Sequence, residues 1–145
     1  MKKLLTIGLI ALLPIATTAI ARDSVAPHKI EQALNNPQSR GLDKSITLYF
    51  GNKKHSKPQK VFGEFQAKKK TNAFNKTDEE ACQIAFLSAL ISLQDRARKM
   101  GGNAVVDIKS IYNRKEFVSD TEYECGAGAF VAGSTLMGTV VKLGD

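Results

Sequence analysis

The sequence of 145 residues is poor in the residue types that most often carry chemistry. It has two cysteines and two histidines, only 7% of it is aromatic, and Gly-x-x-x-x-Gly-Lys-Ser/Thr, Gly-x-Ser-x-Gly and Cys-x-x-Cys motifs are absent. These absences exclude the common nucleotide-binding loop, the serine-hydrolase elbow and an adjacent dithiol. His28 and His55 have no partner at metal-ligand spacing, so the sequence predicts no metal site and no cofactor.

Long apolar runs are also scarce, and the one at the start of the chain covers residues 4–15. Two lysines precede it and Ala-Ile-Ala follows at 19–21, which is typical of a bacterial signal peptide. The run is shorter than the roughly 20 residues that span a bilayer, and Pro14 interrupts it. We therefore expect cleavage of residues 1–21, export to the periplasm as a soluble protein, and no transmembrane segment in the mature chain.

The mature chain is expected to fold as a short N-terminal arm, residues 22–44, followed by a single domain, residues 45–145. In the arm, a short helical pattern after Pro27 ends at Asn36-Pro37. Period-two alternation predicts half-buried strands over 46–50 and 61–67, which we expect to pair as a hairpin with a long loop.

Three further strands are expected over 103–112, 117–130 and 136–143. Gly126, Gly128 and Gly133 precede a strand-like run rather than a helix, so they favour close strand packing over a phosphate-binding loop.

The sequence predicts a helix over residues 78–100. Thr77 and Glu80 form a capping-box pattern at its start, and Gly101-Gly102 ends it. Its apolar residues fall into two stripes at 100° per residue. The long stripe contains Cys82, Ala85, Phe86, Ala89, Leu90, Leu93, Ala97 and Met100, and the short one contains Ile84, Leu87 and Ile91. We expect the long stripe to lie on a sheet and the arm to cover the short one.

The predicted fold class is therefore α+β, with one long helix packed on a mostly antiparallel sheet in the order β-β-α-β-β-β. Cys82 and Cys125, the only cysteines of a chain expected to be exported, predict one disulfide that joins the helix to the fourth strand. A redox-active pair is the alternative, although the two residues are far apart in sequence.

Seven lysines lie between residues 53 and 70, opposed only by Glu64. They are Lys53, Lys54, Lys57, Lys60, Lys68, Lys69 and Lys70. Together they form a candidate anion-binding patch for lipid headgroups, lipopolysaccharide or an acidic envelope protein. The alternative is that they keep an outermost strand from aggregating edge to edge. Nucleic acid is not an expected partner, because the periplasm lacks it and few aromatic residues lie among the lysines.

Three pairs of segments carry a resemblance to known proteins: residues 48–51 with 63–65, 78–82 with 86–90, and 101–106 with 124–129. Together they resemble a family of small exported bacterial proteins of unknown function, often labelled as excinuclease ATPase subunits. The phosphate-binding motif that such an ATPase needs is absent here, so we reject ATPase and excinuclease activity.

The helix, the Gly-Gly-Asn-Ala-Val-Val segment at 101–106 and the strand with Cys125 are more distantly similar to the signalling domain of the Rcs envelope-stress lipoprotein and to YbjQ-like domains. That resemblance implies an α+β layer fold and a non-catalytic sensing or binding role. We therefore expect a periplasmic, non-enzymatic binding or envelope-stress module. The alternative is a thiol-redox protein or other small enzyme centred on Cys82.

Overall fold

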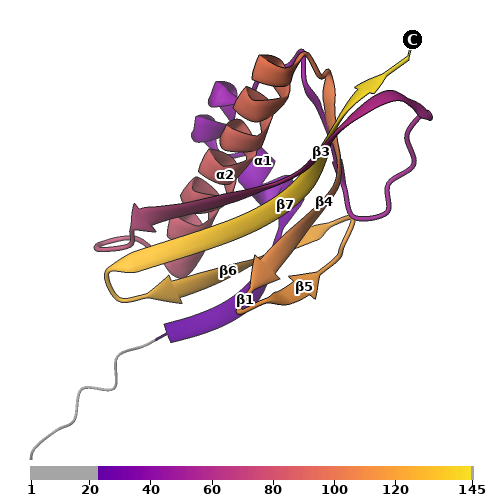
Figure 1. The fold of residues 1–145 in the computed structure, drawn as a ribbon. Helices are drawn as coiled ribbons and strands as arrows, with labels where there is room; N and C mark the ends of the chain where they lie inside the picture. The colour runs from indigo at the N-terminus through magenta and orange to yellow at the C-terminus, as the bar shows by residue number, and fades with distance from the viewer. Residues whose placement is uncertain (1–22, 145) are drawn as a thin grey trace, which may run out of the picture.

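The computed structural model of the protein describes residues 23–144, so the predicted signal peptide, residues 1–21, lies outside the described residues. A seven-stranded, mostly antiparallel sheet carries one long helix. Both helices lie on the same side of this sheet (Figure 1). The α+β architecture with one main helix agrees with the sequence, whereas the order and pairing of the strands differ in part.

The element bounds are as follows. The strands are β1 (Asp23–Lys29), β2 (Thr47–Phe50), β3 (Pro58–Asn72), β4 (Ala104–Tyr112), β5 (Lys115–Phe117), β6 (Glu122–Gly128) and β7 (Val131–Leu143). The helices are α1 (Ile30–Leu34) and α2 (Asp78–Met100), and a 3₁₀ turn, η1, spans Pro37–Gly41.

Helix α2 has the predicted ends. The Thr77 hydroxyl accepts from the Glu80 backbone N–H at 3.1 Å, and the Glu80 carboxylate accepts from the Thr77 N–H at 3.0 Å. Gly101 ends the helix with φ +82°, a left-handed conformation that glycine adopts without strain. The capping box and the glycine stop are thus both confirmed.

The two apolar stripes of α2 are covered from two sides. The long stripe packs on the sheet in the main core, where Cys82, Phe86 and Leu90 are fully buried. The short stripe faces α1 and η1, where Leu87 is buried and Gly41 approaches Ile91. The prediction that the N-terminal segment covers this stripe is confirmed.

The predicted hairpin between the first two strands is wrong. Strand β2 instead pairs in parallel with β4, and β3 pairs in antiparallel register with β7 from Pro58↔Leu143 to Asn72↔Val131. Strand β3 has 15 residues and β7 has 13, whereas β2 has only four. Pairing β3 with β7 therefore forms hydrogen bonds to far more backbone groups than pairing β3 with β2 could.

The N-terminal segment is more than an arm, because Asp23–Lys29 forms β1 and pairs with β6. The sequence did not indicate this strand because Pro27 lies within it. The proline is tolerated because β1 lies at an edge of the sheet. The predicted strand over 117–130 is divided into β5 and β6, which a turn around Ser119 and Asp120 separates. The predicted strand over 136–143 begins earlier, at Val131.

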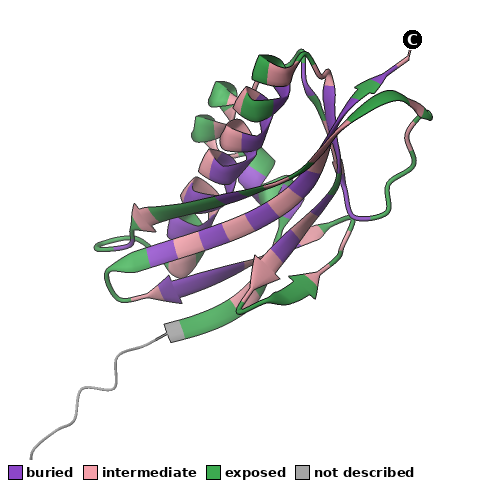
Figure 2. Cartoon of the chain, viewed as in Figure 1, coloured by how far each residue is buried: buried purple, intermediate pink, exposed green. Residues whose placement is uncertain are grey.

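Burial alternates along β7, as Figure 2 shows. Ala132, Leu136 and Val140 enter the main core beneath α2, while the alternate residues Gly133, Thr135, Met137 and Thr139 point to the opposite face. We call this opposite side, which no described helix covers in Figure 1, the open face of the sheet. It carries the candidate site described next.

Candidate functional site

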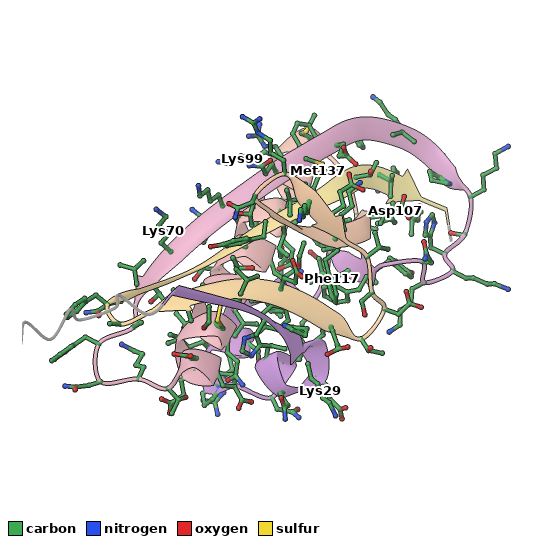
Figure 3. The ribbon with its side chains drawn as sticks, turned by 90° about the horizontal axis from the view of Figure 1, so that it is seen from below. Lys29, Lys70, Lys99, Asp107, Phe117 and Met137 are labelled. Atoms are coloured by element: carbon green, nitrogen blue, oxygen red, sulfur yellow. A yellow bond between two sulfur atoms is a disulfide. The ribbon has the colours of Figure 1, made fainter. Side chains whose placement is uncertain are left out.

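The structure joins Cys82 of α2 to Cys125 of β6 by a disulfide, as predicted, with Cα atoms 5.8 Å apart (Figure 3). Cys82 is 0% and Cys125 is 1% exposed. A thiol that exchanges with other proteins needs a partly exposed sulfur. The complete burial of both residues therefore favours a structural bond between the layers.

A ring stack runs beside the disulfide. Phe86 lies one helical turn after Cys82, and Tyr123 lies two residues before Cys125, so the same two elements meet again. The Phe86 and Tyr123 ring centroids are 3.8 Å apart, and His28 stacks on Tyr123 with centroids 5.6 Å apart. Burial lowers the pKa of His28. The negative charges of Glu79 and Asp78 act in the opposite direction, but their effect on this pKa is smaller.

The Tyr123 hydroxyl is buried and has no hydrogen-bond partner among the described residues. Burial raises the pKa of Tyr123 well above its usual value of 10.0, since the phenolate would lose its hydration. A raised folded-state pKa gives stability that is present below pH 10 and is lost as the pH rises above it.

Replacing Tyr123 with Phe is therefore expected to leave stability at pH 7 unchanged or higher, because it removes an unpaired buried hydroxyl. Between pH 8 and pH 11 the wild-type protein should lose about 1.4 kcal/mol more unfolding free energy than Tyr123→Phe. Urea unfolding at both pH values measures this difference. Tyr49→Phe is the control and should keep the wild-type loss; equal losses in wild type and Tyr123→Phe would contradict the assignment.

The seven lysines of the predicted patch do not form one cluster. Lys53, Lys54 and Lys57 lie in the loop before β3, and Lys60 lies at the start of β3 over the Phe62 ring at 4.9 Å. The other three lie near the far end of the strand. Eight residues of extended chain, roughly 26 Å, separate Lys60 from Lys68. We call the second group, Lys68, Lys69 and Lys70, the distal lysines, and Figure 3 shows Lys70 among them.

The distal lysines also divide between the two faces of the sheet. Lys68 pairs with Thr135 and Lys70 with Gly133, both on the open face, whereas Lys69 pairs with Ser134 on the helix side. All three side chains are exposed on an edge strand. None has an ion pair within residues 23–144.

A pocket of about 360 Å³ opens beside Lys68 and Lys70. Among residues 23–144, no acidic residue lines it. Its lining is Lys68, Lys70, Ile111, Tyr112, Asn113, Gly126, Val131, Gly133, Ser134 and Thr135. We call this the basic pocket. It combines two ammonium groups with hydroxyl and amide groups, which suits an anionic oxygen-rich ligand.

The basic pocket lies at a fork in the sheet. One edge of β7 pairs first with β6, at Gly133↔Gly126, and then with β4, from Leu136↔Ser110 onwards. Ser134 and Thr135 fall between these two pairings. The Ser134 hydroxyl is buried and has no hydrogen-bond partner among the described residues. Of these two residues, Thr135 points to the open face beside Lys68, whereas the Ser134 hydroxyl lies on the helix side of the sheet.

Close packing of Tyr112 on Gly126 shapes one wall of the pocket. A Cβ atom on Gly126 would lie 2.7 Å from the Tyr112 ring, so only glycine admits the ring here. The sequence indicated that Gly126 and Gly133 serve close packing, and their pairing across β6 and β7 agrees with that. It gave no signal for Tyr112, Asn113 or Thr135, which strand pairing brings to the pocket.

Another lysine near the open face, Lys109, is already neutralised. Its ammonium lies 3.0 Å from Glu116 and 3.6 Å from Glu64. The hydrogen bond that it donates to Glu116 raises the pKa of Lys109, with smaller support from Glu64. Lys109 therefore offers a ligand less free positive charge than Lys68 and Lys70 do.

The remaining chemistry-bearing residues do not converge. His28 lies in the ring stack and His55 in the exposed loop against Tyr49, and residues 23–144 contain no group of three His, Cys, Asp or Glu side chains suited to a metal. Within that range no helix has the length and apolarity needed to cross a membrane.

Comparison of the chain with protein-family models, curated proteins and solved structures finds no match.

Proposed function

We propose that the protein is a non-enzymatic binding module of the bacterial envelope, and that its basic pocket holds a phosphate or similar anionic group. The observation that carries this proposal is the pair of unpaired lysines, Lys68 and Lys70, beside a polar pocket with no acidic residue. The whole chain has a formal net charge of +7, of which Lys2 and Lys3 in the predicted signal peptide supply two, so the mature protein keeps a positive charge that attracts anions over long range.

The pocket groups suggest how an anion would be held. Lys68 and Lys70 would flank it as flexible point charges, while the Thr135 hydroxyl and the Asn113 amide would supply directed hydrogen bonds. Nothing in this arrangement pairs a nucleophile with a base, so binding rather than turnover is the activity that we propose.

The envelope location rests on two features of the chain. The predicted signal peptide directs it to the periplasm, and a disulfide is stable in that oxidising compartment. The resemblance to envelope proteins noted from the sequence points the same way. The alternative, a thiol-redox enzyme centred on Cys82, is disfavoured because Cys82 is fully buried.

The proposal predicts that inorganic pyrophosphate binds the wild-type protein and that Lys68→Gln with Lys70→Gln weakens this binding about tenfold or more, because two charge-assisted contacts are lost. Binding should also weaken steeply with salt, since the attraction is screened over roughly 8 Å at physiological ionic strength. Isothermal titration calorimetry at two salt concentrations measures both effects.

The matched control is Lys53→Gln with Lys54→Gln, which removes the same charge from the loop before β3. This variant should bind pyrophosphate almost as tightly as the wild type. Equal weakening in both double variants would indicate diffuse attraction with no site. If neither double variant binds pyrophosphate more weakly, the result would favour the alternative, that the distal lysines keep the edge strand from aggregating.

A further inference from the structure

Two exposed phenylalanines meet at the end of the molecule next to the basic pocket. Phe74 is 56% and Phe130 is 68% exposed, and their rings stack with centroids 6.1 Å apart. Val131 beside them is 51% exposed. We call these three residues the aromatic tip. Apolar side chains that gather on a surface in this way mark an interaction site more often than isolated ones do.

Backbone hydrogen bonds hold the aromatic tip in place. Phe130 lies in the short turn between β6 and β7, and its carbonyl accepts from the Ala73 N–H at 2.8 Å. The Asn72 side chain accepts from the Phe74 N–H at 2.8 Å. The two loops therefore present their rings in a fixed geometry, which lowers the entropy that binding would cost.

Two lysines lie beside the aromatic tip. Lys70 lines the surface depression that contains Phe74, Phe130 and Val131, and it also lines the basic pocket. Lys76 follows Phe74 by two residues and is exposed. The nearby acidic side chains at the start of α2 interact with the end of that helix and with β1.

Those acidic residues are Asp78, Glu79 and Glu80. Glu80 caps the helix, Glu79 accepts from Gln83, and both Asp78 and Glu79 act on His28 on the helix side of β1. The tip thus combines an apolar centre with a rim that carries Lys70 and Lys76.

We infer that the aromatic tip inserts into the headgroup region of an anionic lipid bilayer while the distal lysines contact lipid phosphates. This inference rests on the proposed function and names lipid phosphate as the source of the anion. Rings at the boundary between headgroups and acyl chains, with lysines beside them, are a known mode of peripheral membrane binding. The tip consists of loops at one end of the sheet, so it can enter the interface without unfolding.

A second copy of the chain is a poorer occupant of this surface. In a two-fold contact the same patch meets itself, so the lysines beside the tip, Lys70 and Lys76, would be brought into one interface from both copies. Like charges placed opposite each other oppose association. A bilayer with anionic headgroups complements both the apolar centre and the rim.

The absence of tryptophan from the sequence allows a direct test. Phe130→Trp places a single tryptophan in the aromatic tip, and Val61→Trp places one at the other end of β3, where Val61 is 60% exposed. With vesicles of phosphatidylglycerol and phosphatidylcholine, Phe130→Trp emission should shift to the blue and be quenched by brominated acyl chains. Val61→Trp should do neither.

A second pair of variants separates this inference from the proposed function. Phe74→Ser with Phe130→Ser should weaken vesicle binding about tenfold or more, because the apolar burial is lost, yet retain pyrophosphate binding. Val61→Ser with Val118→Ser, which alters other exposed valines, should change neither.

Three outcomes would overturn the inference. Unchanged vesicle binding in the double phenylalanine variant, or no quenching of the Phe130→Trp emission by brominated lipid, would exclude insertion of the tip. Sedimentation that shows a wild-type dimer, converted to monomer by the double phenylalanine variant, would assign the tip to self-association. Failure of the wild type to bind pyrophosphate would instead reject the proposed function itself.

Discussion

Reduction of the Cys82–Cys125 disulfide should lower the free energy of unfolding by up to about 4 kcal/mol. The bond closes a loop with a sequence separation of 43 residues, and the chain-entropy model gives roughly this value as an upper figure for such a loop. A small domain has a total stability of about 5 to 15 kcal/mol, so the loss is a large share of it. Urea unfolding with and without reductant measures the change.

Cys82→Ala with Cys125→Ala is the matched variant, because it removes the bond without leaving a thiol. It should unfold at a clearly lower urea concentration than the oxidised wild type. A thiol assay on oxidised, unfolded wild-type protein should find no free thiol. Two free thiols in that assay, or a double variant as stable as the wild type, would contradict the structural role of the bond.

Replacement of Gln94 with Leu should cost about 2 kcal/mol of stability, because leucine would leave the Asp43 N–H and the Ile46 carbonyl unpaired at about 1 kcal/mol or more each, while the Asp43 carbonyl would still accept from the Ile46 N–H. Gln94 is 2% exposed, and its amide bonds these groups in the segment before β2. It accepts from the Asp43 N–H at 2.8 Å and donates to the carbonyls of Asp43 and Ile46 at 2.9 Å. Urea unfolding measures the loss.

The control for Gln94→Leu is Gln66→Leu on β3, where the side chain is exposed. Its effect on the urea midpoint should be small. Amide hydrogen exchange adds a local test, since the Gln94 variant should lose protection first around residues 43–46. A Gln94 variant that matches the Gln66 variant in stability would show that these bonds contribute little.

The local signals in the sequence predicted α2 well because they act within a few residues. The Thr77–Glu80 capping box and Gly101 define both ends, and the two apolar stripes indicated a cover on each side. Because side chains alternate along a strand, Lys68, Lys69 and Lys70 cannot share one face, and the register with β7 agrees.

Strand pairing could not be predicted in the same way, because it depends on contacts between distant segments. Nothing near β2 indicates that its partner is β4 rather than β3. The same limit hid the basic pocket, whose walls come from β3, β4, β6 and β7. The seven lysines are close together in the sequence. In the fold, the extended strand β3 separates the distal lysines from Lys60 and from the three lysines in the loop before the strand.

Site-resolved NMR with pyrophosphate tests the central claim, the anion site in the basic pocket, most directly. Titration of ¹⁵N-labelled protein should shift the amides of Lys68, Lys70 and Asn113 and of residues 133–135 in a saturable way, while residues 53–57 stay in place. Shifts confined to residues 53–57, or the absence of any saturable shift, would contradict the account.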